Sequence, residues 1–183
     1  QCLYSLWETE RVQQLNERDY TTLAYELALR IPEQGKDILQ TQRQRIHNPD
    51  RLRQFYFISR AMTADTLKLD SLFQSLLQAE NRRIEPWAAT TLSYLNHSTR
   101  KDYAVKYIRP ALEELTEVQR TGDIFFPRNW VGALLRNHDS EAAYKAVETF
   151  LSVYPDYSPL LKNKILQAAY PLYRKYADKE KIS

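Results

Sequence analysis

The chain has 183 residues, and 43% of them are hydrophobic, so it can fill a sizeable core and is not a disordered protein. Its 26 Lys and Arg residues against 23 Asp and Glu residues give a formal net charge of +3, without the one-sided basicity of a dedicated nucleic-acid binder. A single cysteine, Cys2, excludes an intramolecular disulfide framework and a cysteine-rich metal site.

The apolar runs and the first residues of the chain show whether a membrane segment or a signal peptide is expected. No run approaches the roughly 18 consecutive apolar residues of a membrane-spanning helix, so we expect no membrane segment. The stretch from Gln1 to Tyr4 has neither an initiating Met nor a basic region, and it lies directly within a helical pattern. We therefore expect a fragment of a longer polypeptide. Any signal peptide would lie upstream, and the compartment stays open.

Residue composition predicts an all-α fold. The chain holds only 3 Gly, lacks Asn-Gly and Asp-Gly pairs, and is dominated by Leu, Ala, Gln, Glu, Lys and Arg. Apolar spacing and short connections indicate about ten helices, arranged as antiparallel hairpins in a HEAT- or armadillo-like right-handed superhelix. We expect one such domain over residues 1–183, although no strict repeat with a fixed period accompanies it.

Start signals place the helices of the first half. A first helix covers residues 3–15, and Asp19 is expected to cap a second helix over residues 20–31. Asn48-Pro49-Asp50 supplies an N-cap, an N1 proline and a first-turn carboxylate for a later helix. Thr63-Ala64-Asp65 then caps a helix with an amphipathic apolar pattern.

In the second half of the chain, three prolines indicate where helices begin or bend. Pro86 opens a helix, and Ser140 caps another. Pro110 stands in the middle of the helical segment 103–118, where it removes a backbone donor and predicts a kink or two short helices. The last helix is expected to kink at Pro171.

The largest break between helices is the segment from Gly122 to Trp130, which we name the elbow. Gly122 can adopt the left-handed conformation that ends a helix, and Pro127 suits the first turn of the next helix. The apolar side chains between them are too hydrophobic for a solvated loop, so we expect a buried elbow. Its structural residues are Gly122, Ile124, Phe125, Phe126, Pro127 and Trp130.

The histidines offer no metal-binding motif. His47, His97 and His138 lie far apart in the sequence, whereas a zinc hydrolase needs two histidines one helical turn apart. Each stands beside an Asn at a helix end, where an imidazole is favourable against the helix dipole, and metal ligation is the less favoured alternative. The sequence also lacks a Gly-x-Ser-x-Gly motif and a Gly-rich phosphate loop. We therefore assign no catalytic residue and no metal ligand.

A string of arginines raises the possibility of an RNA-binding surface. Arg43, Arg45, Arg51 and Arg53 bracket a helix start, and the chain holds 13 Tyr that could stack on bases. Acidic residues nearby favour the other interpretation, a solvated outer face, so we expect no nucleic-acid partner.

Two arginines flank the elbow. A guanidinium beside an aromatic wall can offer two parallel hydrogen bonds to a carboxylate, for example the C-terminus of a peptide. Arg120 and Arg128 are therefore candidates to face a substrate. The alternative, favoured on sequence alone, is that they cap helix ends or pair with Asp123, Glu114 or Glu117.

Several separated blocks of the sequence carry a resemblance to one protein family. They are Asn48–Arg51 with Phe55, Phe57 and Ile58, then Asn81–Trp87, Leu92–His97, Gln119–Trp130 and Lys164–Ala169. Together these blocks resemble the C-terminal helical region of bacterial M1-family zinc aminopeptidases, the family of aminopeptidase N. The resemblance spans about residues 48–174, whereas residues 1–47 match only in being helical.

This resemblance implies a parent enzyme that removes single N-terminal residues from peptides. Its zinc would be held by a His-Glu-x-x-His helix and a downstream Glu in a catalytic domain upstream, and this sequence contains none of those residues. In the family, the C-terminal region covers the catalytic cleft and restricts peptide access, and some members lend a basic residue to the substrate's C-terminal side. Arg128 is the best match by position, with Phe126 and Trp130 holding its backbone.

The resemblance thus gives a non-catalytic domain whose partners are the upstream catalytic domain and peptide substrates. The alternative is a free-standing helical-repeat scaffold that binds a protein or peptide on a concave face. A native start codon just before Gln1 would favour the scaffold.

Overall fold

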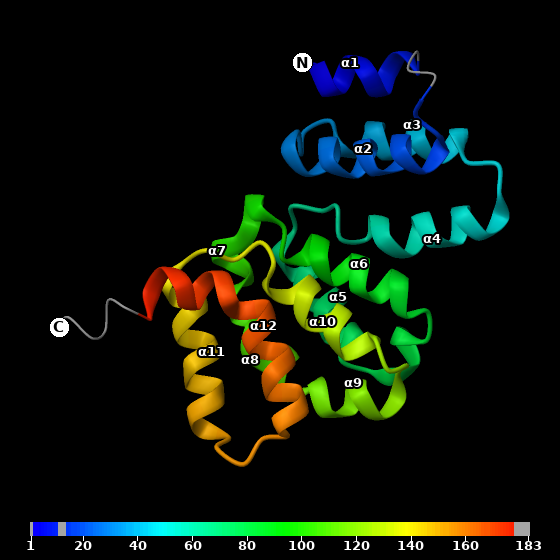
Figure 1. The fold of residues 1–183 in the computed structure, drawn as a ribbon. Helices are drawn as coiled ribbons and strands as arrows, with labels where there is room; N and C mark the ends of the chain where they lie inside the picture. The colour runs from blue at the N-terminus through cyan, green and yellow to red at the C-terminus, as the bar shows by residue number, and fades with distance from the viewer. Residues whose placement is uncertain (1, 11–13, 178–183) are drawn as a thin grey trace. The chain divides into compact units, whose positions relative to one another are not determined.

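The computed structural model describes residues 2–10 and 14–177. Within these ranges every regular element is a helix and no strand occurs, so the predicted all-α class is confirmed (Figure 1). None of the described helices is long and apolar enough to cross a membrane. The helices form two compact units, residues 1–72 and 73–183, and α5 (Thr66–Leu76) crosses the boundary between them. The superhelical stacking and the single domain over 1–183 stay predictions.

The first four helices of unit 1 pack around an aromatic core. They are α1 (Cys2–Thr9), α2 (Glu17–Arg30), α3 (Gly35–Arg45) and α4 (Pro49–Ser59). Helix α2 packs against both α1 and α3, and α3 also contacts α4. The core side chains are Trp7, Tyr20, Ala24, Leu27 and Ile38. Burial of each large apolar side chain among them contributes roughly 1.5–3 kcal/mol to folding.

Helix α2 starts earlier than predicted because Asn16 caps it. The Asn16 Oδ1 accepts hydrogen bonds from the backbone N–H groups of Arg18, at 2.8 Å, and Asp19, at 3.3 Å. The Asp19 carboxylate accepts in return from the Asn16 N–H at 2.8 Å. This reciprocal pair is a capping box. The prediction that Asp19 is the N-cap is therefore wrong, because its carboxylate acts from the third helical position.

The other predicted caps are confirmed. Asn48 Oδ1, Asp65 Oδ1 and Ser140 Oγ each accept a hydrogen bond from a backbone N–H of the following turn, at 3.0, 3.1 and 3.2 Å. Each bond satisfies one of the donors that a helix start leaves without an intrahelical partner. Pro49 follows Asn48 directly and occupies the first turn of α4.

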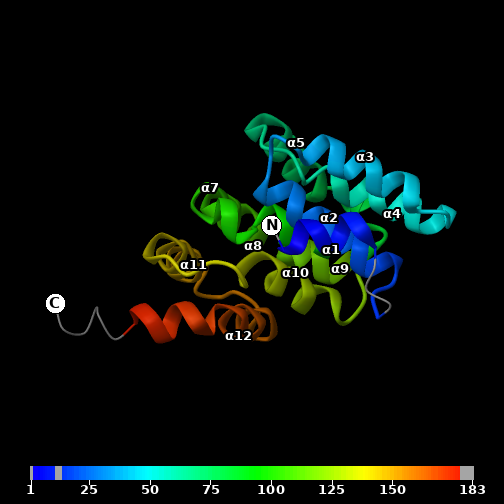
Figure 2. The ribbon, with the colours of Figure 1, turned by 90° about the horizontal axis from the view of Figure 1, so that it is seen from above.

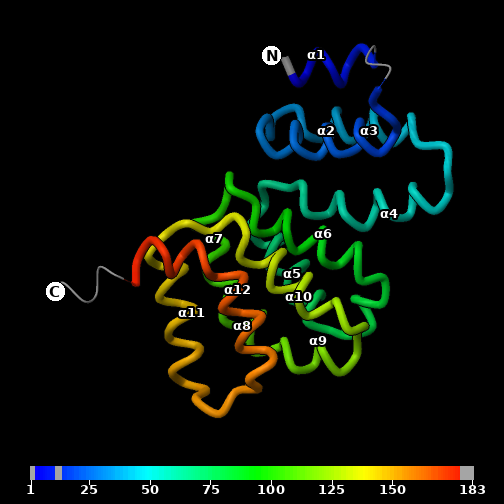
Figure 3. The backbone as a smooth tube through the Cα atoms, viewed as in Figure 1, coloured from blue at the N-terminus to red at the C-terminus, as the bar shows by residue number. Residues whose placement is uncertain are grey.

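Unit 2 is built around a central buried helix, α10. Its 3-10 helices are η1 (Ala79–Arg82), η2 (Ser98–Arg100) and η3 (Val105–Tyr107). Its α-helices after α5 are α6 (Glu85–Leu95), α7 (Lys101–Ala104), α8 (Ile108–Glu113), α9 (Leu115–Thr121), α10 (Phe126–Leu135), α11 (Glu141–Val153) and α12 (Pro159–Tyr176). Helix α10 packs against α6, α8, α9 and α12, and most of its side chains are buried. The chain reverses between α11 and α12, which form an antiparallel pair (Figure 3).

The segment around Pro110 is divided as its proline predicts. The helical segment 103–118 appears as parts of α7, η3, α8 and α9 rather than as one helix. Pro110 itself lies in the first turn of α8, where its missing N–H leaves no intrahelical bond unmade. Short helices here let the chain bend around α10.

Candidate functional site

The elbow is held by a cap that also reaches α6. Asp123 Oδ1 accepts hydrogen bonds from the N–H groups of Phe125, at 2.7 Å, and Phe126, at 2.8 Å, at the start of α10. The Asp123 N–H donates in turn to Glu85 Oε1 at 2.8 Å. This bond joins segments 38 residues apart, so the elbow and the start of α6 share one surface of unit 2.

Gly122 is required for space rather than for a left-handed backbone. Its φ of −108° and ψ of 178° are extended, so the predicted left-handed conformation is wrong. A Cβ at this position would lie 2.5 Å from Phe126 Cδ1 and 2.9 Å from the carbonyl oxygen of Val118. The close passage of the chain over the buried Phe126 ring therefore excludes a side chain.

Only part of the elbow is buried. Phe126, Pro127 and Trp130 are buried as predicted. The prediction is wrong for Ile124, which is 80% exposed, and for Phe125, which is 65% exposed. Both residues precede the first turn of α10, where the Asp123 cap turns the backbone and the core-facing stripe of the helix has not begun.

Trp130 anchors the buried part. Its indole Nε1 donates to the carbonyl oxygen of Ala111 in α8 at 3.0 Å, and the indole is fully buried. The Phe126 ring meets it edge to face, with centroids 5.9 Å apart. The indole thus fills apolar space and satisfies a carbonyl of α8 at the same time.

Three exposed apolar side chains form a patch at the elbow. Ile84 directly precedes Glu85 and is 47% exposed, and the Glu85–Asp123 bond joins its segment to the elbow, where Ile124 and Phe125 are exposed. We name Ile84, Ile124 and Phe125 the elbow patch. Exposed apolar side chains that gather at one site are typical of a surface that another protein, domain or ligand covers.

The two candidate arginines differ in their surroundings. Arg120 forms an ion pair with Glu117, with Nη2 2.5 Å from Oε1 and Nε 2.7 Å from Oε2. This hydrogen-bonded pairing raises the pKa of Arg120 and lowers that of Glu117. Arg120 is therefore paired with a neighbouring acidic residue, which was the alternative to a role in facing a substrate.

Arg128 is exposed in the first turn of α10, and no ion pair or hydrogen bond of its side chain occurs among the described residues. A cation in the first turn opposes the helix dipole, so helix stability does not account for this position. Its guanidinium is free to accept a ligand beside the elbow patch. This surface can therefore bind a ligand in two ways. The elbow patch provides apolar contact, and the Arg128 guanidinium provides two hydrogen-bond donors for a carboxylate.

Arg82 supports this surface from inside, and sequence reasoning missed it. Its side chain is 2% exposed, and Nη1 donates to the carbonyl oxygens of Leu76, at 3.1 Å, and Leu77, at 2.9 Å, and to Glu114 Oε1, at 2.9 Å. The guanidinium carbon lies 5.6 Å from the centroid of the Trp130 ring. The Nε and Nη2 atoms are buried without a protein partner. Nothing in the sequence distinguishes this buried arginine from its exposed neighbour Arg83.

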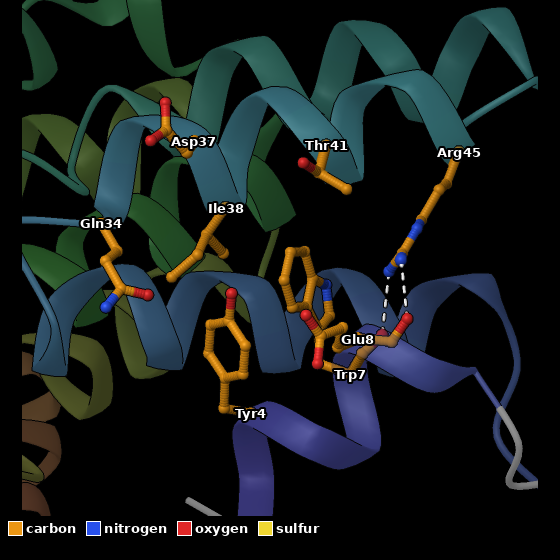
Figure 4. A pocket seen from close by; sticks show the side chains of 8 residues that line it. All are labelled: Tyr4, Trp7, Glu8, Gln34, Asp37, Ile38, Thr41 and Arg45. Atoms are coloured by element: carbon orange, nitrogen blue, oxygen red, sulfur yellow. Dashed lines mark hydrogen bonds between the residues drawn. The ribbon is translucent and has the colours of Figure 1, made fainter.

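A pocket, separate from the elbow, lies between α1 and α3 in unit 1. It has a volume of about 290 Å³ and is lined by Tyr4, Trp7, Glu8, Gln34, Asp37, Ile38, Thr41 and Arg45. Figure 4 shows the Tyr4 and Trp7 rings on the α1 side facing Ile38 and Thr41 of α3, with the Asp37 carboxylate pointing away from them. The lining combines two aromatic rings with polar and charged side chains, which is a common composition of ligand pockets.

The cation at one end of this pocket is already engaged. Arg45 donates to the carbonyl oxygens of Trp7, at 2.9 Å, and Glu8, at 3.1 Å, which are the dashed lines in Figure 4. Its Nε lies 3.4 Å from Glu10 Oε1, and its guanidinium carbon lies 4.8 Å from the Trp7 ring centroid. The guanidinium therefore caps the C-terminal carbonyls of α1.

The remaining members of the arginine string also have partners within unit 1. Arg43 stacks on the Tyr56 ring, Arg51 pairs with Glu17 at 3.2 Å, and Arg53 pairs with Asp50. Charges that are paired on the helix surface fit the interpretation of a solvated outer face.

Two of the three histidines, His97 and His138, are buried. His138 Nε2 lies 2.9 Å from Asn96 Oδ1, and burial lowers the pKa of His138 to about 4. His97 Nδ1 accepts from the Thr99 N–H at 3.2 Å, whereas His47 is exposed. Across residues 2–10 and 14–177, no group of three or more His, Cys, Asp and Glu side chains is arranged to hold a metal ion.

No protein-family model, curated protein or solved structure matches the chain. The elbow is therefore the candidate functional site on its own chemistry. It combines an exposed apolar patch, an exposed arginine without an internal partner, and a rigid support made by Trp130 and Arg82.

Proposed function

We propose that the chain is the non-catalytic C-terminal helical domain of an M1-like zinc aminopeptidase, where it covers the active-site cleft and controls peptide access. One observation carries the proposal. Two of the blocks that resemble the family, Asn81–Trp87 and Gln119–Trp130, meet through the Glu85–Asp123 bond and together expose the elbow patch. A domain that packs over a cleft needs such an apolar surface beside polar groups that contact substrate.

Within this proposal Arg128 faces the peptide. Its guanidinium binds the carboxylate at the C-terminal side of a short substrate, while Phe125 contacts an apolar substrate side chain. The buried Phe126 and Trp130 fix the first turn of α10, so Arg128 keeps its position when the cleft is empty. Zinc and the residues that cleave the peptide bond belong to the catalytic domain expected upstream.

The test compares the complete polypeptide that contains this chain with the chain alone. We expect the complete polypeptide to hydrolyse aminoacyl-4-nitroanilides and to lose this activity with a zinc chelator, whereas the chain alone is inactive. Chelator-sensitive hydrolysis by the chain alone would overturn the proposal. A complete polypeptide that begins at the present first helix and hydrolyses no peptide would instead support the free-standing scaffold.

A further inference from the structure

A surface of α12, separate from the elbow, has the features of a second interaction site. Helix α12 packs on α10 and α11 through a buried stripe made of Leu161, Ile165, Ala169 and Leu172. Figure 2 shows α12 along the outer edge of unit 2, with α10 and α11 on its inner side. The opposite face of α12 is therefore not covered by the helices of unit 2 that the structure describes.

This uncovered face is not the polar face of a helix that meets only water. Leu160 is 56% exposed and Tyr170 is 63% exposed. A shallow depression of about 390 Å³ lies along the same helix and is lined by Asn163, Leu166, Gln167 and Tyr170. Spacings of three and four residues place this set on one side of α12.

Pro171 adds a backbone acceptor at the same place. It lies within α12 and has no N–H group, so it cannot donate to the carbonyl oxygen of Gln167 four residues earlier. That carbonyl belongs to a residue that lines the depression. The face thus offers apolar contact, two side-chain amides and a backbone oxygen that has lost its usual helical donor.

The charge of α12 is entirely positive. The helix carries Lys162, Lys164, Arg174 and Lys175 and no Asp or Glu. Lys175 donates to the carbonyl oxygen of Asp139, whereas the other three form no ion pair among the described residues. Arg174 in the last turn stabilises the helix dipole, but Lys162 and Lys164 lie towards the opposite end, where a cation has no such role.

We propose that this face of α12 docks an acidic segment of a partner protein. Carboxylates of the segment pair with Lys164 and Arg174, an apolar side chain packs between Leu160 and Tyr170, and an N–H donor meets the Gln167 carbonyl. An anionic membrane would attract the same cations. A peptide fits better, because Asn163 and Gln167 need polar partners that lipid chains lack.

Fluorescence polarisation tests the proposal with a labelled, helix-forming peptide of about 12 residues that carries Glu on one face and Leu at i, i+3, i+4 and i+7. A matched peptide has Gln in place of every Glu. We expect the acidic peptide to bind and the Gln peptide to bind at least about tenfold more weakly, and affinity to fall as NaCl rises from about 0.05 to 0.3 M.

Two variants place the binding on α12. The double variant Lys164→Gln/Arg174→Gln and the single variant Tyr170→Gln should each weaken binding about tenfold, since both change exposed or partly exposed side chains and leave the buried stripe intact. The control is Arg53→Gln/Arg60→Gln, which makes the same change of charge on exposed residues of unit 1 and should leave binding unchanged. Circular dichroism melting curves verify that all variants fold.

Three results would overturn the proposal. One is no binding of the acidic peptide at about 1 mM, another is equal affinity for the Gln peptide, and the third is unchanged binding by both α12 variants. Phosphatidylserine vesicles form the second arm of the experiment. If they capture the protein through Lys164 and Arg174 while the peptide does not bind, the occupant is a membrane surface instead. The aminopeptidase assay is independent of these results, because none of the α12 residues belongs to the elbow.

Discussion

The Arg82 guanidinium joins three segments of unit 2 while it is withdrawn from water. Removing it leaves Glu114 and two carbonyl groups without their donor, so Arg82→Ala should lower the free energy of unfolding by about 3 kcal/mol. Urea titration measures this loss. Arg83→Ala is the matched control, and since Arg83 is exposed it should change stability by less than about 0.5 kcal/mol. Equal losses for the two variants would contradict the buried role of Arg82.

Arg128 should affect substrate binding without affecting folding. In the aminopeptidase that we propose contains this chain, Arg128→Ala should raise KM for short peptides on the order of tenfold with little change in kcat, because a charged hydrogen bond to the substrate carboxylate is lost. Steady-state kinetics with a tetrapeptide and with its C-terminal amide separate this contact from general effects, since the amide lacks the charge. Arg120→Ala is the control, because Arg120 already pairs with Glu117. A lower melting temperature with unchanged KM would assign Arg128 to stability.

His138 makes the protein sensitive to acid. The Asn96 Nδ2 donates to the Leu92 carbonyl, which turns Asn96 Oδ1 towards His138 Nε2 and makes this nitrogen the donor. The buried Nδ1 has no partner, so protonation there places an unsatisfied N–H inside the core.

The sign of the pH effect follows from the lowered pKa. The unfolded chain binds a proton at His138 below its ordinary pKa of 6.5, whereas the folded state does so only near 4. His138 therefore does not reduce the free energy of unfolding above pH 6.5. As the pH falls to about 4, its protonation in the unfolded chain lowers the free energy of unfolding by a total of about 3 kcal/mol. Urea titrations between these pH values measure it. His138→Gln should flatten this part of the profile, and an unchanged slope would contradict the assignment.

At the scale of the elements, substitutions of one glycine before α10 and of one glycine inside α10 should have opposite effects on stability. Gly122→Ala should destabilise by about 1–3 kcal/mol, because the added methyl meets Phe126 and the Val118 carbonyl at less than contact distance. Gly132→Ala lies inside α10, where the nearest atom is Arg136 Nη2 at 4.0 Å, and it should stabilise by about 0.5–1 kcal/mol. Thermal and urea unfolding of both variants measure the difference, and the same sign for both would contradict it.

Local signals predicted the helix starts well, because caps act within one turn of sequence. Asn48, Asp65 and Ser140 form the hydrogen bonds expected of them, and Pro110 divides its segment. The prediction was wrong for Asp19 because Asn16 is the N-cap of α2. Asp19 occupies the third position of that helix, where its carboxylate accepts a hydrogen bond from the Asn16 N–H.

The elbow was harder to predict, since its burial depends on contacts distant in sequence. Apolar character alone made Ile124 and Phe125 look buried, but the Asp123 cap and its bond to Glu85 leave them outside the core. The same limit applies to Arg82, whose partner Glu114 is 32 residues away. Contacts between residues more than 30 positions apart determine which side chains of the candidate site are exposed. Local sequence patterns do not predict such contacts.

At the scale of the whole molecule, each compact unit has its own core. The core of unit 1 contains Trp7 and Tyr20, whereas in unit 2 the buried Trp130 packs against Phe126 and donates to the Ala111 carbonyl oxygen. We expect Arg82→Ala to speed hydrogen exchange of the amides in α10 while the amides of α2 keep their protection. Native-state exchange read by NMR or mass spectrometry measures this. Equal acceleration in both helices would show that the two units unfold together.

The elbow patch also has a consequence for handling the protein. Ile124 and Phe125 expose most of their surface to water, and none of the described residues of unit 2 covers them. A preparation of this chain alone should therefore self-associate as its concentration rises, and Phe125→Ser should improve its solubility without loss of stability. Light scattering against concentration measures this self-association.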